Sequence, residues 1–106
     1  MNIDVSIVLS VFNGCNDLHI TLDSILSQTF NNFELLIYDN ASSDGTWEIL
    51  SDYIQRDNRI WAKRNSINLG GPCLNAIAGI ERAKGKYTAR IDSGDYWVKN
   101  KLEKQV

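Results

Sequence analysis

Two patterns of apolar residues alternate along this chain, and the alternation restricts the possible folds more than any other feature. Short, nearly continuous apolar runs of the kind that form buried strands occur at Val5–Ser10, Phe33–Tyr38, Ile60–Ala62 and Tyr87–Ile91. Segments with helical spacing of apolar residues separate them. One strand and one helix recur about every 25 to 30 residues, and this alternation favours right-handed βαβ crossovers. We therefore expect an α/β domain with a mostly parallel sheet of about four strands and flanking helices.

Local signals place the expected helices. Asp44 can cap the second helix. Gly70-Gly71-Pro72 opens the third helix, and Gly85 is expected to close it. The apolar stripes of the first, second and last helices are Leu18, Leu22, Ile25 and Leu26; Trp47, Leu50, Tyr53 and Ile54; and Val98, Leu102 and Val106.

Size, charge and cysteine content exclude several classes of protein. A chain of 106 residues can form one domain with its own core. Its net charge of -2 provides no basic surface, so we expect no nucleic-acid partner. Cys15 and Cys73 fit no close-spaced metal or redox motif and are expected to be reduced thiols. The first residues lack a basic leader, and the apolar run Val5–Phe12 is too short to span a bilayer. We expect a cytoplasmic chain or a soluble piece of a larger protein.

Polar residues follow every expected strand. In open parallel sheets, ligands bind outside the carboxyl ends of the strands, near the point where the strand order reverses. The sheet would therefore bring these side chains to one rim, which predicts a binding site there. In strand order, the rim residues are Ser10 and Asn13, Asp39 and Asn40, Arg64 and Asn65, and Asp92 and Asp95.

The rim lacks the glycine-rich loops that usually bind nucleotides. The first strand continues into SVFNGCND, which is not a dinucleotide fingerprint, and no P-loop motif occurs. A diphosphate would then need another counter-charge. Mg²⁺ or Mn²⁺ held by Asp92 and Asp95 would supply it, because these ions prefer oxygen ligands. Taken alone, D-S-G-D is more often an ordinary solvated turn with a helix cap, because turn chemistry by itself favours Asp, Ser and Gly.

The wider context of these residues resembles a known family. The segment from VSIVLSVFNG to DNASSDGTWEIL, including SILSQTF-x-x-FELLI-x-D, is similar to the opening of family 2 glycosyltransferases, nucleotide-sugar enzymes of the GT-A fold. The similarity continues through DNRI, NLGG, AKGKYTARIDSGD and KLEKQV, and so covers nearly the whole chain.

The resemblance implies a Rossmann-like GT-A half that binds the nucleotide and the metal. Asp39, Asn40 and Asp44 correspond to the family's D-D/N-x-S-x-D motif, and Asp92 to the first acid of its D-x-D motif. No catalytic residue is expected within the chain, because the family places its base and acceptor site in the following half. Together with the rim, this predicts metal ligands Asp92 and Asp95 and nucleotide-binding residues Ser10, Phe12, Asn13, Asp39, Asn40, Arg64, Asp92 and Ser93.

Three residues depart from the family pattern. Ser10 stands where many members have Pro or Thr, Asn40 replaces the second Asp, and Gly94 replaces the second acid of D-x-D. Positions 92 and 94 of an extended strand point the same way, so D-x-D aims two carboxylates at one ion. Gly94 permits a turn with positive φ, which would let Asp95 substitute; otherwise Asp92 acts through a metal-bound water. Either arrangement predicts weak metal binding without diphosphate.

Two residues are expected to contact the base. The amide of Asn40 offers a donor and an acceptor, which suits the N3-H and O4 of uracil or thymine and favours UDP- or dTDP-sugars. The alternative is an Asx turn between Asn40 and Ser42. Phe12 could stack on the base, although an aromatic residue at this strand end is as often part of the core.

These observations predict the donor-binding domain of a glycosyltransferase. The full-length enzyme would transfer a sugar from a nucleotide diphosphate-sugar to a saccharide or lipid-linked acceptor in polysaccharide or cell-surface glycan synthesis. We expect residues 1–106 to be one domain, truncated before the acceptor half, and its exposed edge to favour self-association. Membrane association of a full-length protein is left open.

Two other functions compete with this interpretation. A flavodoxin-like or receiver-like module has the same alternation, but it needs hydroxyl-rich or acidic residues after the first strand, where SVFN stands. A non-catalytic sugar-nucleotide-binding or interaction module with a degenerate acidic motif remains open because of Gly94.

Overall fold

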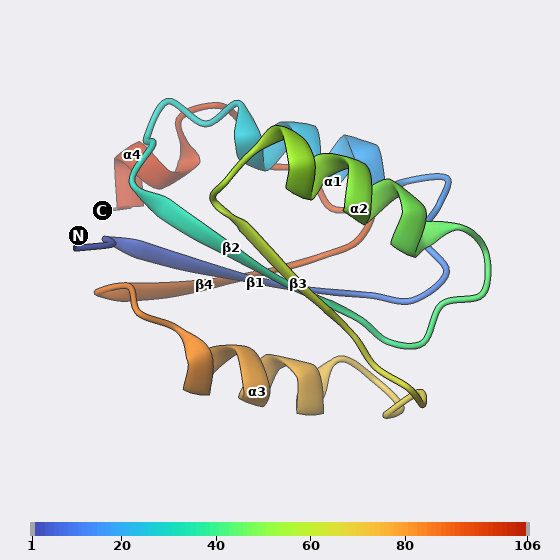
Figure 1. The fold of residues 1–106 in the computed structure, drawn as a ribbon. Helices are drawn as coiled ribbons and strands as arrows, with labels where there is room; N and C mark the ends of the chain where they lie inside the picture. Colours follow the sequence, from blue (N-terminus) through green and yellow to red (C-terminus); the bar gives the residue numbers. More distant parts are fainter. Residues whose placement is uncertain (1, 106) are drawn as a thin grey trace.

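The computed structural model describes residues 2–105 as one parallel sheet between two layers of helices (Figure 1). Helices α1, α2 and α4 cover one face of the sheet, and α3 covers the other. The predicted fold class is therefore confirmed. No helix within residues 2–105 is long and apolar enough to cross a membrane. The elements are β1 (Val5–Val11), α1 (Leu18–Leu26), β2 (Phe33–Asp39), α2 (Thr46–Arg56), β3 (Ile60–Arg64), α3 (Cys73–Arg82), β4 (Tyr87–Asp92) and α4 (Lys101–Gln105).

The strand order places a reversal of direction at β1. The strands are arranged β3-β2-β1-β4, so the chain moves outward from β1 to β3 and then returns to the other side of β1. The gap between the crossovers on either side of β1 is the topological switch point of the sheet. Ser10 of β1 pairs in register with Asp92 of β4 there, and Val11 pairs with Asp39 of β2.

The main core lies between the sheet and the layer of α1, α2 and α4. Alternate residues of β1 point into it because side chains of a strand alternate between faces, and Ile7 and Leu9 are completely buried. Full burial of such a side chain stabilises the fold by about 1.5–3 kcal/mol. Since β1 and β2 are buried along nearly their whole length, the strands that end at the rim form a rigid platform.

All four strands extend further toward the rim than their apolar runs indicate. The ladder continues through polar residues, with Val11 opposite Asp39 and Asp39 opposite Arg64. Backbone pairing does not depend on an apolar side chain, so hydropathy alone underestimates strand length here. As a result Asp39, Arg64 and Asp92 belong to the strands themselves.

Two expected helix boundaries differ from the structure. Gly45, with φ of 96°, is the N-cap residue of α2, while Asp44 acts from one position earlier and accepts a hydrogen bond from the Thr46 amide at 3.1 Å. Helix α3 ends at Arg82, and Gly85 does not cap it. Gly85 instead packs against β1, where a Cβ atom would lie 2.5 Å from the Ser6 nitrogen. Glycine is needed there for close approach of two backbones.

The last helix also begins later than expected. Helix α4 starts at Lys101, so Val98 lies outside it and is exposed. Leu102 is buried in the core as expected, and Val106 lies outside the described residues.

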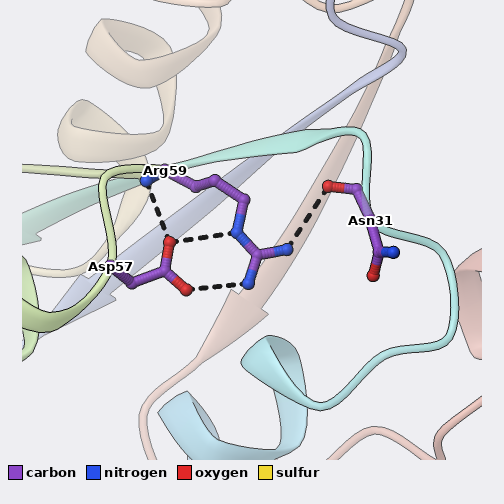
Figure 2. Close-up of polar contacts among 3 residues, drawn as sticks. All are labelled: Asn31, Asp57 and Arg59. Atoms are coloured by element: carbon purple, nitrogen blue, oxygen red, sulfur yellow. Dashed lines mark hydrogen bonds and ion pairs between the residues drawn. The ribbon is translucent and has the colours of Figure 1, made fainter.

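An ion pair fixes the opposite, amino end of the sheet. Figure 2 shows Arg59 bound to both carboxylate oxygens of Asp57, with Nη2 2.7 Å and Nε 3.0 Å from them, and also donating to the Asn31 carbonyl. This fork joins the turn before β3 to the loop before β2. Hydrogen bonding from Arg59 lowers the pKa of Asp57, which is therefore held as the carboxylate.

Candidate functional site

A shallow cavity of about 300 Å³ lies at the topological switch point. It is bounded by the ends of β1, β2 and β4 and by the loop that leads into α3. Five of the eight predicted nucleotide-binding residues line it, together with three residues that the sequence had suggested only as the start of a helix. The lining residues are Ser10, Phe12, Asn40, Gly70, Gly71, Pro72, Asp92 and Ser93.

Larger hollows occur elsewhere on the described surface but do not gather the carboxyl ends of several strands. One of about 540 Å³ is formed by the segment Asp95–Val98 and α4. Another, of about 410 Å³, lies near Arg59 and Lys84 at the amino end of the sheet. In open α/β sheets the carboxyl end of the strands is where ligands bind, so position and chemistry favour the smaller cavity.

Three predicted site residues lie beside this cavity without lining it. Asn13, in a left-handed conformation with φ of 50°, accepts a hydrogen bond from the Ser43 amide at 2.9 Å. Arg64 donates to the Ser42 carbonyl at 3.1 Å. Asp39 is completely buried: its Oδ1 accepts from the Ser42 amide at 3.0 Å, and its Oδ2 has no partner in the described chain. These contacts stabilise the loop after β2, and a direct role for any of the three in nucleotide binding stays a prediction.

The amide of Asn40 is fully occupied by the protein. Its Oδ1 accepts from the Asn65 side chain and the Leu69 amide, and its Nδ2 donates to Asn68 and to the Gly70 carbonyl. An Asn side chain offers two donor hydrogens and two acceptor lone pairs, so none is left for a base. In this structure Asn40 therefore organises the loop that borders the cavity. The alternative, an Asx turn between Asn40 and Ser42, does not form, because the Ser42 amide donates to Asp39 Oδ1 three residues earlier.

Phe12 has the exposure that stacking requires. Its side chain is 53% exposed at the end of β1, so it is not a core residue. Phe12 lines the cavity together with the glycines before α3. An exposed aromatic ring beside a cavity provides a flat apolar surface for a base or a sugar.

The structure does not bring Asp95 to the cavity that Asp92 lines. Gly94 has the expected positive φ of 95°, and the Asp95 amide donates to the Asp92 carbonyl at 3.0 Å. Thr21 of α1 then fixes the turn, accepting from the Gly94 amide and donating to the Asp95 carbonyl, both at 2.8 Å. Asp95 lines the hollow beside α4 instead.

The residues at the cavity fit a divalent ion only in part. Within residues 2–105 no three His, Cys, Asp or Glu side chains cluster as a metal site. Asp92 is the one carboxylate lining the cavity, as far as the described residues show. Mg²⁺ keeps several waters and is commonly held by one or two carboxylates together with substrate phosphates. Asp92 therefore suits an ion that binds with a diphosphate, not one held by the protein alone.

A second acidic residue of the motif stabilises the loops behind the cavity. Asp44 accepts hydrogen bonds from the Thr46 side chain and amide, and from the Cys15 amide at 3.1 Å. The Thr46 hydroxyl is the main cause that lowers the pKa of Asp44 to about 2. The neighbouring Asp44 carboxylate, mainly through a side-chain hydrogen bond, raises the pKa of the Cys15 thiol. Asp44 thus joins the loop after β1 to the start of α2.

Sequence reasoning missed the residues that complete the cavity wall. Gly70, Gly71 and Pro72 line it, and Asn75 of α3 lies behind it, donating to Ser10 at 3.1 Å. The pair of glycines was the available signal, because glycine often marks close approach of backbone to a ligand as well as a helix boundary.

Comparison with known proteins identifies the family. The family model described as glycosyl transferase family 2 matches residues 6–106, nearly the entire chain. The chain belongs to glycosyl transferase family 2. It is 37% identical over 102 residues to the UDP-Glc:alpha-D-GlcNAc-diphosphoundecaprenol beta-1,3-glucosyltransferase WfaP of Escherichia coli, a match that covers 96% of this chain and 39% of WfaP. It is 38% identical to the putative teichuronic acid biosynthesis glycosyltransferase TuaG of Bacillus subtilis, across 96% of this chain and 40% of TuaG.

Solved structures of other proteins have the same fold as this chain. The S. aureus TarS 1-349 complex with UDP-GlcNAc superposes with a TM-score of 0.91 at 26% identity, over 97% of this chain and 30% of that protein. The fold also matches the mannosyltransferase PcManGT of Pyrobaculum calidifontis, solved with GDP-Man and Mn2+, with a TM-score of 0.81 at 18% identity. The chain spans less than half the length of each of these relatives.

Proposed function

We propose that this chain binds a nucleotide diphosphate-sugar in the cavity between β1 and β4 and is the donor-binding part of a glycosyltransferase. The observation that carries the proposal is the meeting of Ser10, Phe12 and Asp92 in one cavity at the switch point of the sheet. The full-length enzyme would add the sugar to a saccharide or lipid-linked acceptor during synthesis of a cell-surface glycan. The names of WfaP and TuaG support this class of acceptor.

The cavity suggests how the donor lies. Phe12 offers a surface on which the base stacks, and Asp92 is placed for the diphosphate end. A cavity of about 300 Å³ holds only part of a nucleotide-sugar, so the sugar would extend beyond the described surface. Mg²⁺ or Mn²⁺, when bound beside Asp92, would neutralise charge on the diphosphate. Asp92 would hold that ion, because a carboxylate and a diphosphate repel each other without it. The pairing of Ser10 with Asp92 keeps the ends of β1 and β4 side by side.

A uracil or thymine base is proposed over guanine. Support comes from relatives that use UDP-Glc or were solved with UDP-GlcNAc. The Asn40 amide does not contribute to this preference, because the protein itself uses all of its donors and acceptors.

Calorimetric titration with UDP, dTDP and GDP, each with and without Mn²⁺, tests the proposal. UDP or dTDP should bind several-fold more tightly than GDP, and Mn²⁺ should strengthen binding because Asp92 alone holds an ion weakly. With Mn²⁺ present, Asp92→Ala should lower affinity for UDP by about tenfold or more, since an ion contact to a charged group is worth roughly 1.5–3 kcal/mol. Asp52→Ala removes an exposed carboxylate of α2 and is the matched control. Tighter binding of GDP, or unchanged binding by a folded Asp92→Ala variant, would contradict the assignment.

Residues 1–106 should bind the donor without transferring its sugar. An inverting transfer needs a general base within hydrogen-bond reach of the acceptor hydroxyl. Asp92, the carboxylate of the cavity, is assigned to the diphosphate, and we place the base in a further part of the full-length enzyme. The measurement is incubation with labelled UDP-sugars, Mn²⁺ and saccharide or lipid-linked acceptors. Labelled glycan above the level without protein, lost in Asp92→Ala, would show that this chain holds its own base.

A further inference from the structure

Three buried or half-buried asparagines form a continuous path of hydrogen bonds behind the cavity. We call Asn40, Asn65 and Asn75 the asparagine relay. Asn65 Nδ2 donates to Asn40 Oδ1 at 3.1 Å and to Asn75 Oδ1 at 2.9 Å. Asn75 Nδ2 then donates to the hydroxyl oxygen of Ser10 at 3.1 Å. Asn40 and Asn75 are only 2% and 1% exposed, so water does not compete for these bonds. The relay joins the loop after β3 to the cavity wall.

The direction of every bond in the relay is set by the backbone at one end. The Leu69 amide can only donate, and it lies 2.9 Å from Asn40 Oδ1. The Gly70 carbonyl can only accept, and it lies 2.9 Å from Asn40 Nδ2. These two contacts determine which atom of the Asn40 amide is oxygen and which is nitrogen. If the Asn40 amide were flipped, its NH₂ group would face the Leu69 amide and its oxygen would face the Gly70 carbonyl, and neither pair can form a hydrogen bond.

The fixed orientation of Asn40 passes along the relay. Because Asn40 Oδ1 accepts, Asn65 must present its NH₂ group, whose second hydrogen then goes to Asn75 Oδ1. Asn75 must therefore turn its own NH₂ group toward Ser10. Ser10 Oγ therefore accepts the hydrogen bond from Asn75. Within residues 2–105 no group accepts the Ser10 hydroxyl proton. Since Ser10 lines the cavity, that proton is available to a ligand.

We propose that the asparagine relay holds Ser10 as a hydrogen-bond donor toward the cavity, so that Ser10 selects a ligand oxygen that accepts a hydrogen bond over an N–H group that can only donate. Such an oxygen is a carbonyl of a pyrimidine base or an oxygen of the diphosphate. Ser10 is the specificity-determining residue, and Asn65 and Asn75 are positioning residues that act through it. The identity of the ligand rests on the proposed function, whereas the direction of the relay is a property of the chain alone.

Asn75→Asp reverses the polarity of Ser10 with almost no change of shape. The introduced carboxylate accepts from Asn65 as before, but it also accepts the Ser10 proton, which turns the lone pairs of Ser10 toward the ligand. The titration is run at pH 8, well above the ordinary carboxyl pKa of about 4, and the hydrogen bonds from Asn65 and Ser10 favour the ionised carboxylate against the burial that raises its pKa. UDP affinity should fall at least as far as in Ser10→Ala, by about threefold to tenfold, the value of one hydrogen bond. Ser10→Thr keeps the hydroxyl and should retain most of the affinity.

A double-mutant cycle separates polarity from the added charge. In the Ser10→Ala background there is no hydroxyl to reverse, so Asn75→Asp should have a clearly smaller effect there than in the unaltered chain. Equal effects in the two backgrounds would overturn the proposal. Repeating the titration with uridine identifies the contact: an equal loss for uridine and UDP places it at the base, and a loss confined to UDP places it at the diphosphate. Both results support a donating Ser10.

The chain without ligand provides an independent test. In nuclear magnetic resonance spectra, Ser10→Ala should speed hydrogen exchange of the Asn75 side-chain NH₂ and leave that of Asn40 unchanged. An unaffected Asn75 would overturn the relay even if UDP binds. Failure of the unaltered chain to bind UDP, with the exchange result as expected, would instead overturn only the proposed function and leave the direction of Ser10 established.

Discussion

Ala41 has a backbone conformation that only a few residue types adopt readily. Its φ is 64°, in the left-handed region, where a non-glycine residue costs about 1–2 kcal/mol. Backbone hydrogen bonds on both sides fix this conformation. The Asn40 amide donates to the Val11 carbonyl, and the Ala41 and Asn65 amides both donate to the Asp39 carbonyl. The strain is located directly after Asp39 and Asn40, the first two residues of the D-D/N-x-S-x-D motif, where it lets the loop return toward β1.

Replacing Ala41 with glycine should relieve this strain. Glycine adopts positive φ at no steric cost, although it adds entropy to the unfolded chain, so Ala41→Gly should leave stability unchanged or raise it by up to about 1 kcal/mol. The control is Ala78→Gly within α3, which should lose about 1 kcal/mol. Urea unfolding of both variants measures the difference. Equal losses at the two positions would mean that the strain at Ala41 is negligible.

Asp44 should make the chain sensitive to acid. Its pKa in the folded chain is about 2, below the ordinary value of 3.8, so the unfolded state binds the proton more tightly. The stabilisation by Asp44 is therefore complete above pH 3.8 and is lost as the pH falls through 2. Unfolding measured between pH 6 and 2 should show less acid sensitivity for Asp44→Asn. An identical pH profile for this variant would contradict the assignment.

The same carboxylate should protect the Cys15 thiol. Because Asp44 raises the pKa of Cys15, fewer thiolates form near neutral pH, and the thiolate is the reactive species. Asp44→Asn should speed alkylation of Cys15 by iodoacetamide. Exposed Cys73 provides the control within the same molecule and should react at an unchanged rate. Equal acceleration of both cysteines would point to general loosening of the fold.

Helix α3 contacts the sheet through a glycine. A Cβ atom on Gly79 would lie 2.4 Å from a methyl group of Val8 in β1, so the helix rests on the strand at this point. The path of α3 in turn places Asn75 beside Ser10 and Pro72 at the cavity. The close packing of α3 against β1 therefore determines where the wall of the proposed site lies.

Gly79→Ala should destabilise the chain although alanine is the better helix former. Overpacking costs about 1–3 kcal/mol, which exceeds or cancels the roughly 1 kcal/mol gained in helix propensity. Combining it with Val8→Ala should remove most of this cost, because the clashing methyl groups are gone. Ile77→Ala, at an exposed position of the same helix, should change stability by no more than about 0.5 kcal/mol. Thermal unfolding tests these values, and a stabilising Gly79→Ala would show that α3 is not held closely against β1.

The sequence predicted the elements well because their signals are local. Buried parallel strands need unbroken apolar runs, and those runs located all four strands. It also indicated that Ser10 and Asp92 would share a rim, because strand ends of a parallel sheet meet. Partners that are distant in the chain could not be predicted: Thr21 turns Asp95 away from the cavity, and Leu69 and Gly70 occupy the amide of Asn40.

Both edges of the sheet are only partly covered. Strand β3 pairs only with β2 and has Ile60 as its single buried residue, and β4 pairs only with β1 and has Ile91 as its single buried residue. Tyr87 is 49% exposed on this edge strand. An unpaired strand edge presents backbone groups that can bind another strand, so the edge of β4 offers a place where a second chain or a further strand can add.

This chain should therefore associate with itself through β4 at high concentration. Two copies could pair their β4 edges, and each pair of strands would satisfy backbone groups that otherwise bond to water. Thr88→Lys would bring like charges together across such a pair and should weaken association. Gln55→Lys adds the same charge to the exposed surface of α2, away from this edge, and should leave association unchanged. Sedimentation velocity over a range of concentrations distinguishes the cases: equal effects of the two substitutions would indicate a general charge effect, and a chain that stays monomeric throughout would show that the β4 edge does not pair with a copy of itself.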